Sequence, residues 1–370
     1  MREDFSVEEL ARPDLADLVP YEPHRWEPGL IKLDANENPY DFPAEVLAGL
    51  FAGVDGQTFN RYPDPAAGEL RADLARYVGV RPEGVLVGNG SDEMILNLFL
   101  AFATGGSVAI ATPTFGMYAV HARIAGAVPV AVPRRAGDFA ADMATHLRRA
   151  REDGVRVTVL CSPNNPTGNA TPPEEVAELA AAARGLVVVD EAYGEFGGRS
   201  CLPLLAEHPN LVVLKSFSKS FGLAGLRVGY LVARPEVVAQ VLKVKQPFNV
   251  NTFSQMAARA VLRHLPLFYE RIDAIRRERE VLRAAMAEIP GVTVHPSEAN
   301  FLLFRTPLPA GEVHRALMRR GVLVRLLDGP DLPGYLRVTV GRPEENRAFL
   351  AALRDVMVAR GGPAPEGPGG

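Results

Sequence analysis

The segment SFSKSFGLAGLR, residues 216–227, directly follows an apolar run and carries residue types that could bind two groups of one molecule. Ser216, Ser218 and Arg227 offer hydroxyls and a guanidinium fork, which suit a phosphate. Lys219 offers an amine that can form an imine with an aldehyde. The segment therefore indicates a site for a ligand that carries both a phosphate and an aldehyde.

Four other side chains follow apolar runs elsewhere in the chain. Asp190 ends the run LVVVD, and a buried acid needs a partner such as a protonated ring nitrogen. Tyr193 and Asn165 could form hydrogen bonds to a ring oxygen, and Phe115 offers a flat face. Read singly, Asp190 is equally well a loop cap and Lys219 a surface lysine. Together the residues favour a single ring-shaped ligand.

The segment GNGSDE predicts a helix that starts near Gly90, with Ser91 or Asp92 as its cap. Backbone N–H groups at such a start bind anions. The match to a dinucleotide-binding loop fails because Glu93 stands where the third glycine is required. A phosphate, a pyridine nitrogen, an aldehyde and a phenolic oxygen all belong to pyridoxal 5'-phosphate. A lysine paired with an acid at the pyridine nitrogen is typical of sites for this cofactor.

The elements that must position these residues are strands alternating with helices. Alanine-rich helical patterns such as PPEEVAELAAAARG separate short apolar runs. The alternation predicts an α/β fold with a mostly parallel sheet, in which chemistry gathers at the carboxyl ends of the strands. The runs read as strands covered on both faces are 85–88, 107–111, 157–161, 186–190, 211–215 and 228–233.

Changes in composition and hydrophobic pattern along the chain predict four segments. Residues 1–44 form a proline-rich N-terminal arm, expected to pack with the smaller domain and the substrate site. Residues 45–264 form the large cofactor-binding domain. Residues 265–357 form a smaller α+β domain with strand-like FLLF and LRVTV segments. Residues 358–370 form a low-complexity tail that we expect to be disordered.

Composition excludes several classes of function. The chain has 370 residues, 47% hydrophobic and 23% charged, which is typical of a globular protein with a sizeable core. A net charge of −4 provides no basic face for nucleic acid. No apolar run reaches the ~18 residues of a membrane-spanning helix, and no apolar signal segment opens the chain. Cys161 and Cys201 lack metal-ligand spacing, so we expect no metal and a reducing cytoplasmic location.

Nine segments occur in the order of one protein family, across nearly the whole chain. The chain therefore resembles the fold-type I pyridoxal-phosphate-dependent aminotransferases of the class II subfamily and, among them, the histidinol-phosphate aminotransferases. The resemblance implies a large domain, with a mixed, mostly parallel sheet sandwiched by helices, and a smaller α+β domain. The segments are LDANENP, NRYPD, GNGSDE, PTFGMY, SPNNPTG, DEAYGEF, SFSKSFGLAGLRVGY, SEANFLLFR and LRVTVGRPEEN.

The resemblance implies a role for each matching residue. Lys219 would hold the cofactor as an aldimine and then move a proton, while Asp190 would pair with the pyridinium nitrogen. Tyr193 and Asn165 would bond the ring 3'-oxygen, and Tyr193 counts with Lys219 and Asp190 as catalytic. Phe115 would stack on the ring, where many relatives carry tyrosine. The implied phosphate cup consists of Ser91, Asp92, Ser216, Ser218 and Arg227.

Tyr62, in the segment NRYPD, resembles the tyrosine that reaches the cofactor phosphate of a neighbouring subunit. The resemblance therefore implies a homodimer with shared active sites. The alternative reading of Tyr62 is an ordinary loop tyrosine.

Substrate contacts also come from the resemblance. Arg337 matches the arginine that binds the substrate anion, and Arg325 resembles a second one, although the segment VLVRLLDG departs from the family motif. Tyr21 resembles a tyrosine that closes over the substrate phosphate. Asn36 and Asn300 lie in family motifs and are expected to line the site. Two arginines would let one pocket serve two anionic reactants in turn.

The implied reaction is transamination of L-histidinol phosphate with 2-oxoglutarate to imidazole acetol phosphate and L-glutamate, in histidine biosynthesis. An aromatic amino-acid aminotransferase, acting on phenylalanine or tyrosine, and a threonine-phosphate decarboxylase remain open as alternatives. A pyridoxal-binding regulator is disfavoured because the chain has no added basic helix-turn-helix segment. A nucleotide enzyme is disfavoured by the missing glycine fingerprint.

Overall fold

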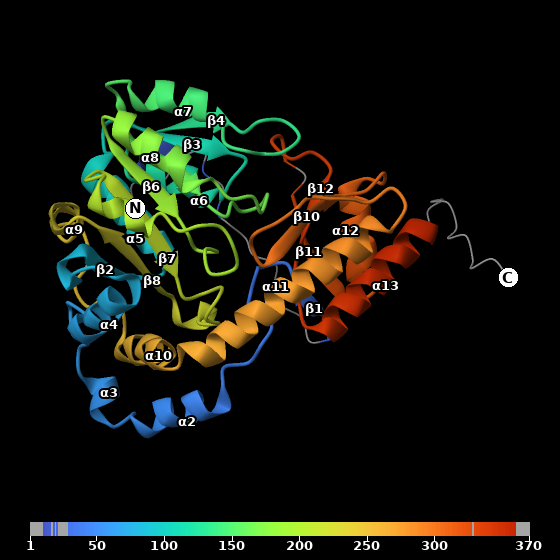
Figure 1. The fold of residues 1–370 in the computed structure, drawn as a ribbon, viewed down its shortest axis with the longest axis horizontal. Coiled ribbons are helices and arrows are strands. Elements are labelled where there is room, and N and C mark those ends of the chain that lie inside the picture. The colour runs from blue at the N-terminus through green and yellow to red at the C-terminus, as the bar shows by residue number, and fades with distance from the viewer. Residues whose placement is uncertain (1–9, 16–17, 19, 21–28, 328, 360–370) are drawn as a thin grey trace, which may run out of the picture.

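The computed structural model describes residues 10–15, 18, 20, 29–327 and 329–359. Figure 1 shows two bodies side by side, each built on one sheet, with helix α11 (Leu265–Ala287) running from the larger to the smaller. Tyr21 and residues 360–370 lie outside the described residues, so the predictions made for them stay predictions. Helix α13 (Pro343–Ala359) includes residues 358 and 359, which we expected to begin the tail.

The larger sheet has seven strands, and all but one of them run in the same direction. Only β8 is antiparallel to its neighbours, β2 and β7, while the other pairs are parallel. Six carboxyl ends therefore lie at one edge. In spatial order the strands are β2 (Val85–Asn89), β8 (Val228–Ala233), β7 (Leu211–Ser216), β6 (Leu186–Asp190), β5 (Val155–Cys161), β3 (Ser107–Thr112) and β4 (Val128–Pro133).

Successive residues of the central strands alternate between two hydrophobic cores. In β6, Val187 and Val189 belong to one core and Val188 to the other. The first core also takes residues of α4 (Gly68–Val78), α8 (Pro173–Ala182) and α10 (Thr252–Arg263). The second takes residues of α5 (Ser91–Phe102), α6 (Met117–Ile124) and α9 (Pro235–Val241). Helices thus cover both faces, and the predicted α/β fold is confirmed.

The six predicted strands of this sheet are all present, but the sequence did not predict β4. Its segment VPVAVP contains Pro129 and Pro133, which cannot donate ladder hydrogen bonds. β4 is an edge strand, where proline is tolerated. Helix α7 (Met143–Ala150) follows it, and Asp142 caps that helix by accepting from the Thr145 amide. Helices α2 (Ala44–Ala52) and α3 (Gln57–Asn60) extend from the lower edge of the larger body in Figure 1.

The smaller sheet joins strands from both ends of the described chain. β1 pairs with β11 in parallel, and the remaining pairs are antiparallel. Helix α12 (Ala310–Met318) packs beside α13 and β11. The predicted strands FLLF and LRVTV are confirmed as β10 and β12, whereas β1, β9 and β11 were not predicted. In spatial order the strands are β1 (Ile31–Leu33), β11 (Val322–Leu326), β12 (Tyr335–Thr339), β10 (Phe301–Arg305) and β9 (Thr293–Val294).

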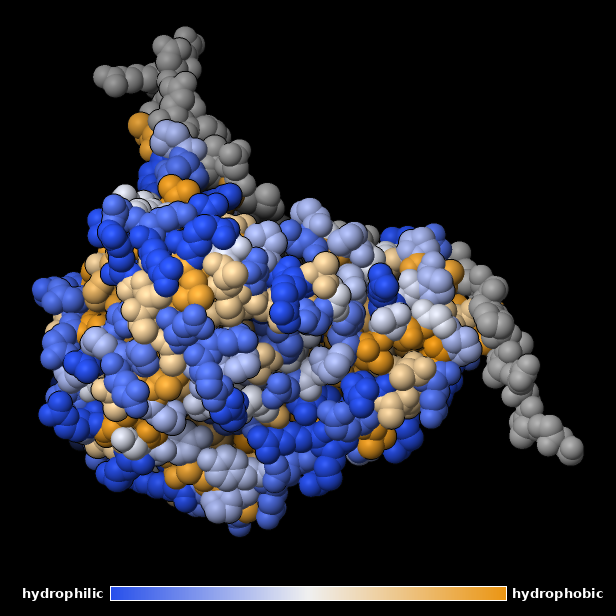
Figure 2. Space-filling model, turned by 45° about the horizontal axis from the view of Figure 1, so that its top comes forward, coloured by the Kyte–Doolittle hydropathy of each residue, from blue (hydrophilic) through white to orange (hydrophobic). Residues whose placement is uncertain are grey.

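The face drawn in Figure 2 is mostly hydrophilic, with apolar side chains in small scattered groups. Within the described ranges, no helix is long and apolar enough to span a membrane. Both cysteines, Cys161 and Cys201, are free and buried. The domain boundaries that we drew from the sequence stay predictions.

Candidate active site

Asp190 is the last residue of β6, at the edge where six strands end, and only 3% of it is exposed. Tyr118 Oη donates to Asp190 Oδ2 at 2.7 Å, and the Ala192 amide donates to Oδ1 at 3.0 Å. Burial raises the pKa of Asp190 to about 6 against these hydrogen bonds. Within the described residues no ion pair neutralises this carboxylate. The position therefore fits a cationic group supplied by a ligand.

Lys219 lies in the loop after β7, and its amine donates to the Ala35 carbonyl at 2.8 Å. Burial, and then the nearby charges of Arg337 and Arg227, lower the pKa of Lys219 to about 8. A substantial fraction of the amine is therefore neutral near pH 8, as nucleophilic attack on an aldehyde requires.

Tyr193 lies in the turn after β6 and meets the N-terminal segment of the described chain. Asn36 Nδ2 donates to Tyr193 Oη at 2.9 Å, and burial raises the pKa of Tyr193 above its usual range. Asn36 has a φ of 54° and is held by its own amide, which donates to Thr339 Oγ1 at 2.9 Å. Asn300 Nδ2 donates to the Asn36 carbonyl at 3.1 Å. Asn36, which is held by Thr339 and Asn300, thus donates to the Tyr193 hydroxyl.

Arg337 of β12 connects the smaller sheet to Asn165 and to the segment before Asn36. Its Nη1 donates to Asn165 Oδ1 at 2.5 Å, and its Nη2 donates to the Asp34 carbonyl at 2.6 Å. Arg325 stands directly opposite Arg337 in the β11–β12 ladder. Directly opposed residues of an antiparallel pair project to the same face of a sheet. Both arginines can therefore serve one anion-binding face.

The residues predicted to bind the cofactor phosphate lie where β2 and β8 run antiparallel. Asn89 pairs with Val228, so the residues that follow β2 lie beside Arg227, which precedes β8. Arg227 Nη2 forms an ion pair with Asp92 Oδ2 at 3.1 Å, and Nη1 donates to Ser218 Oγ at 3.4 Å. The Ser218 amide donates to Ser216 Oγ at 3.1 Å.

The start of α5 differs from the sequence prediction. Ser91 is the first helical residue, so Gly90 occupies the N-cap position that we had assigned to Ser91 or Asp92. Gly90 has a φ of 81°, and a Cβ there would lie 2.6 Å from Arg227 Nη2. Glycine is required because the chain turns sharply and passes close to the guanidinium.

Phe115 and Tyr118 come from the segment PTFGMY, and only the first was predicted to belong to the site. Their ring centroids are 5.6 Å apart at 87°. The sequence prediction did not include Tyr118, although a second aromatic residue stands three positions after Phe115 in the same motif. An open groove of about 680 Å³ lies beside Phe115 and is also lined by Leu326 and Leu332 of the smaller body.

Tyr62 lies at the surface of the described chain. It is 82% exposed, and its ring stacks on Phe248 with centroids 4.5 Å apart. The role that the sequence assigns to Tyr62 involves a second subunit and stays a prediction. Tyr21 lies outside the described residues.

The residues present fit pyridoxal 5'-phosphate. The α5 N-terminus, the serine hydroxyls and Arg227 match its phosphate. The buried Asp190 lacks a cation and matches a ring nitrogen, and Lys219 supplies an amine of lowered pKa. No group of three or more histidine, cysteine, aspartate or glutamate side chains in the described part of the chain could hold a metal.

Known proteins match the chain over most of its length. The family model for class I and II aminotransferases matches residues 28–353. Histidinol-phosphate aminotransferase 1 of Carboxydothermus hydrogenoformans is 44% identical over 345 residues, which cover 92% of this chain and 97% of that protein.

Solved structures agree in fold. Histidinol-phosphate aminotransferase from Sinorhizobium meliloti, in complex with pyridoxal-5'-phosphate, matches with a TM-score of 0.81 at 26% identity, covering 89% of this chain and 91% of that one. L-threonine-O-3-phosphate decarboxylase from Porphyromonas gingivalis gives 0.79 at 26%, covering 89% and 100%. The fold alone therefore does not separate transamination from decarboxylation.

Proposed function

The chain belongs to the class I and II aminotransferases, and from that membership we propose that it transfers the amino group of L-histidinol phosphate to 2-oxoglutarate. The products are imidazole acetol phosphate and L-glutamate, in histidine biosynthesis. The observation that carries the choice of donor is the 44% identity to a histidinol-phosphate aminotransferase over 97% of that protein. This likeness favours histidinol phosphate over an aromatic amino acid or a threonine-phosphate decarboxylation.

When bound, pyridoxal phosphate supplies a ring that accepts negative charge from the donor carbon. The residues of the chain make that chemistry productive. Asp190 holds a proton on the ring nitrogen, because its buried carboxylate is stabilised by a cation. Lys219 Nζ accepts and returns the proton at the donor carbon, for which an amine of lowered pKa is suited. Tyr193 and Asn165 orient the ring through its oxygen.

Arg325 and Arg337 would receive the two reactants in turn. Histidinol phosphate carries a phosphate and 2-oxoglutarate carries two carboxylates, and guanidinium groups bind both kinds of anion. The register of β11 and β12 supports shared use, because it directs both side chains to one face.

The enzyme is further proposed to be a homodimer with shared active sites. The exposed stack of Tyr62 on Phe248 supports this, because an aromatic pair of this kind at the surface is typical of an interface. Tyr62 would reach the cofactor phosphate of the partner subunit.

A cytoplasmic location completes the proposal. Cys161 and Cys201 are both free, as is usual where thiols stay reduced. Fractionation of cells that express the protein tests this, and recovery in an oxidising compartment would contradict it.

A donor panel tests the reaction. We expect the yellow, cofactor-loaded protein to form glutamate from histidinol phosphate and 2-oxoglutarate, with a kcat/KM well above that for phenylalanine or tyrosine. Lys219→Ala should turn over no donor. Faster glutamate formation from phenylalanine would favour the aromatic alternative, and CO2 release from threonine phosphate would overturn the assignment.

A further inference from the structure

A buried ionic cluster of Lys215, Glu191 and Glu195 has no role in the reaction proposed above. Lys215, the penultimate residue of β7, contacts Glu191 Oε2 at 3.2 Å and Glu195 Oε1 at 3.0 Å. The three side chains are 7%, 3% and 6% exposed. Burial alone would lower the pKa of Lys215, but the charges of Glu195 and Glu191 outweigh it and raise the pKa above its usual range. Lys215 is therefore a fixed ammonium between two carboxylates.

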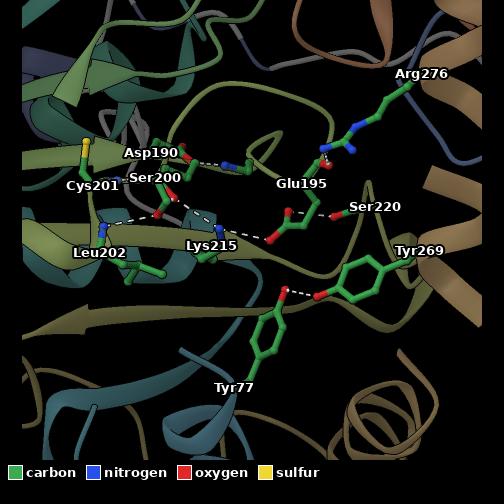
Figure 3. A network of polar contacts seen from close by, with 12 residues as sticks. Tyr77, Asp190, Glu195, Ser200, Cys201, Leu202, Lys215, Ser220, Tyr269 and Arg276 are labelled. Carbon is green, nitrogen blue, oxygen red and sulfur yellow. Dashed lines mark hydrogen bonds and ion pairs between the residues drawn. The ribbon is translucent and has the colours of Figure 1, made fainter. Parts of the chain in front are cut away.

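Each carboxylate contacts a different loop, and Figure 3 shows Glu195 between Lys215 and Ser220. Glu195 Oε2 accepts from Ser220 Oγ at 2.9 Å, in the loop after β7. Glu191 accepts from Ser200 Oγ at 2.7 Å through Oε2 and from the Cys201 amide at 2.6 Å through Oε1. The cluster thus joins the turn after β6 to the loop after β7.

The members of the cluster are sequence neighbours of the catalytic residues. Glu191 follows Asp190, and Ser220 follows Lys219. A shift of the ammonium would therefore move the acid that holds the ring nitrogen relative to the amine that moves the proton. Such displacements matter because catalytic groups act only within narrow geometric limits.

We propose that Lys215 is a positioning residue, which holds Glu191 and Glu195 together and thereby sets the separation of Asp190 and Lys219. The proposal rests on the pyridoxal-phosphate chemistry proposed above. Losing the ammonium would leave two buried carboxylates facing each other, and one of them would have to bind a proton, because like charges raise the pKa of a buried acid.

Other titratable groups lie around the cluster. They are Tyr77 of α4, Tyr230 of β8, Tyr269 of α11 and Cys201. Burial raises the pKa of Tyr77 and Tyr230 beyond the usual range and that of Cys201 to about 12. Arg276 of α11 also approaches, donating to the Glu195 carbonyl at 2.6 Å. Glu191 and Glu195 are the two carboxylates whose charge the Lys215 ammonium balances.

The test compares Lys215→Met with Lys243→Met, which removes a surface amine bonded to Gln240. For the loaded enzymes we would measure kcat, KM and, without substrate, the absorbance of the bound cofactor against pH. We expect Lys215→Met to lower kcat about tenfold or more with KM within about threefold, and the loss to deepen as pH rises and the carboxylate pair ionises. The midpoint of the absorbance titration should shift by about half a pH unit or more. Lys243→Met should match the wild type.

Adding Glu195→Gln to Lys215→Met should remove the new pH dependence, because one carboxylate is then left without a like-charged neighbour. Ser220→Ala removes only the link to the Lys219 loop and should shift the absorbance midpoint in the same direction by less. If Lys215→Met does not fold, the single variants Ser220→Ala and Glu195→Gln test whether the cluster positions Asp190 and Lys219. A lower Tm with kcat and absorbance titration unchanged in the folded variants would overturn the proposal. Failure of the wild type to bind the cofactor would instead overturn the proposed function.

Discussion

Asp190 shows how a residue can be unfavourable alone and favourable with a ligand. Its two hydrogen-bond donors are neutral, and burial raises its pKa to about 6. We expect Asp190→Asn to leave the cofactor-free protein as stable as the wild type or more so, while removing most of the Tm gain that pyridoxal phosphate gives. The kcat should fall by about a hundredfold or more, since losing one partner of a buried charge pair costs about 3–5 kcal/mol.

The pH dependence follows from the same pKa. An acid whose pKa rises on folding, here from 3.8 to about 6, stabilises the protein below the lower value and loses that contribution as pH rises through the higher one. The Tm of the cofactor-free wild type should therefore fall relative to Asp190→Asn across this interval. An equal Tm gain with cofactor in both proteins would contradict the assigned partnership.

Lys219 gives a prediction for cofactor capture. Its pKa is lowered to about 8, and only the neutral amine bonds an aldehyde carbon. The rate at which the cofactor-free protein captures pyridoxal phosphate should rise by about tenfold per pH unit below this value and level off above it. Rapid-mixing absorbance measurements would show this, and a rate that kept rising up to the ordinary lysine pKa would refute it.

The segment around Arg325 departs from the family motif, and the register of β11 with β12 makes its proposed role testable. We expect Arg325→Gln to raise the KM for both histidinol phosphate and 2-oxoglutarate by about 10–100-fold. The reason is that a hydrogen bond to a charged group contributes about 1.5–3 kcal/mol. Arg319→Gln removes an exposed arginine after α12 and serves as the control. An effect on neither KM would remove Arg325 from the site.

At this scale the sequence predicts residue types but not their partners. Asp190 stands out because charged residues rarely end buried strands, and Lys219 stands out because it lies among hydroxyl-bearing residues just after one. Nothing in the sequence pairs Asp190 with Tyr118, or Lys219 with the Ala35 carbonyl, because those contacts join residues far apart in the chain. Only folding brings such groups within hydrogen-bond distance.

Among the elements, β8 differs because it runs antiparallel to the other strands of the larger sheet and packs against the start of α5. A Cβ on Gly229 would lie 2.4 Å from the Ser91 amide nitrogen. We expect Gly229→Ala to destabilise the protein by about 1–3 kcal/mol, as overpacking does, and to weaken cofactor binding about tenfold. Gly225→Ala has open space and should change neither; calorimetry and cofactor titration would compare the two. Similar behaviour of both variants would argue against a close fit at α5.

The predictable elements were those with the strongest local signal. Six strands of the larger sheet are continuous apolar runs, because helices bury both of their faces. β4 was obscured by its prolines, and β1 and β9 span only three and two residues. Short strands depend on their partners for stability, so their own residues carry little information.

At the scale of the whole molecule, the proposed shared site predicts complementation between two defective subunits. Tyr62→Ala should weaken the site of its partner, and Lys219→Ala should inactivate its own. Mixed dimers contain one site with both residues intact, so co-refolding equal amounts should recover about a quarter of wild-type activity. Activity no higher than the average of the separate variants would show that each subunit works alone.

The smaller sheet is completed only by the last part of the chain. β1 ends at Leu33, and its partner β11 begins at Val322. A ribosome that adds about 5–20 residues per second needs roughly 15 to 60 seconds to cover that interval. During that interval the nascent chain can assemble the strands that end at the proposed cofactor site, while the two proposed substrate-binding arginines have not yet been translated. The chain could thus bind its cofactor during translation, before it is able to bind an amino donor.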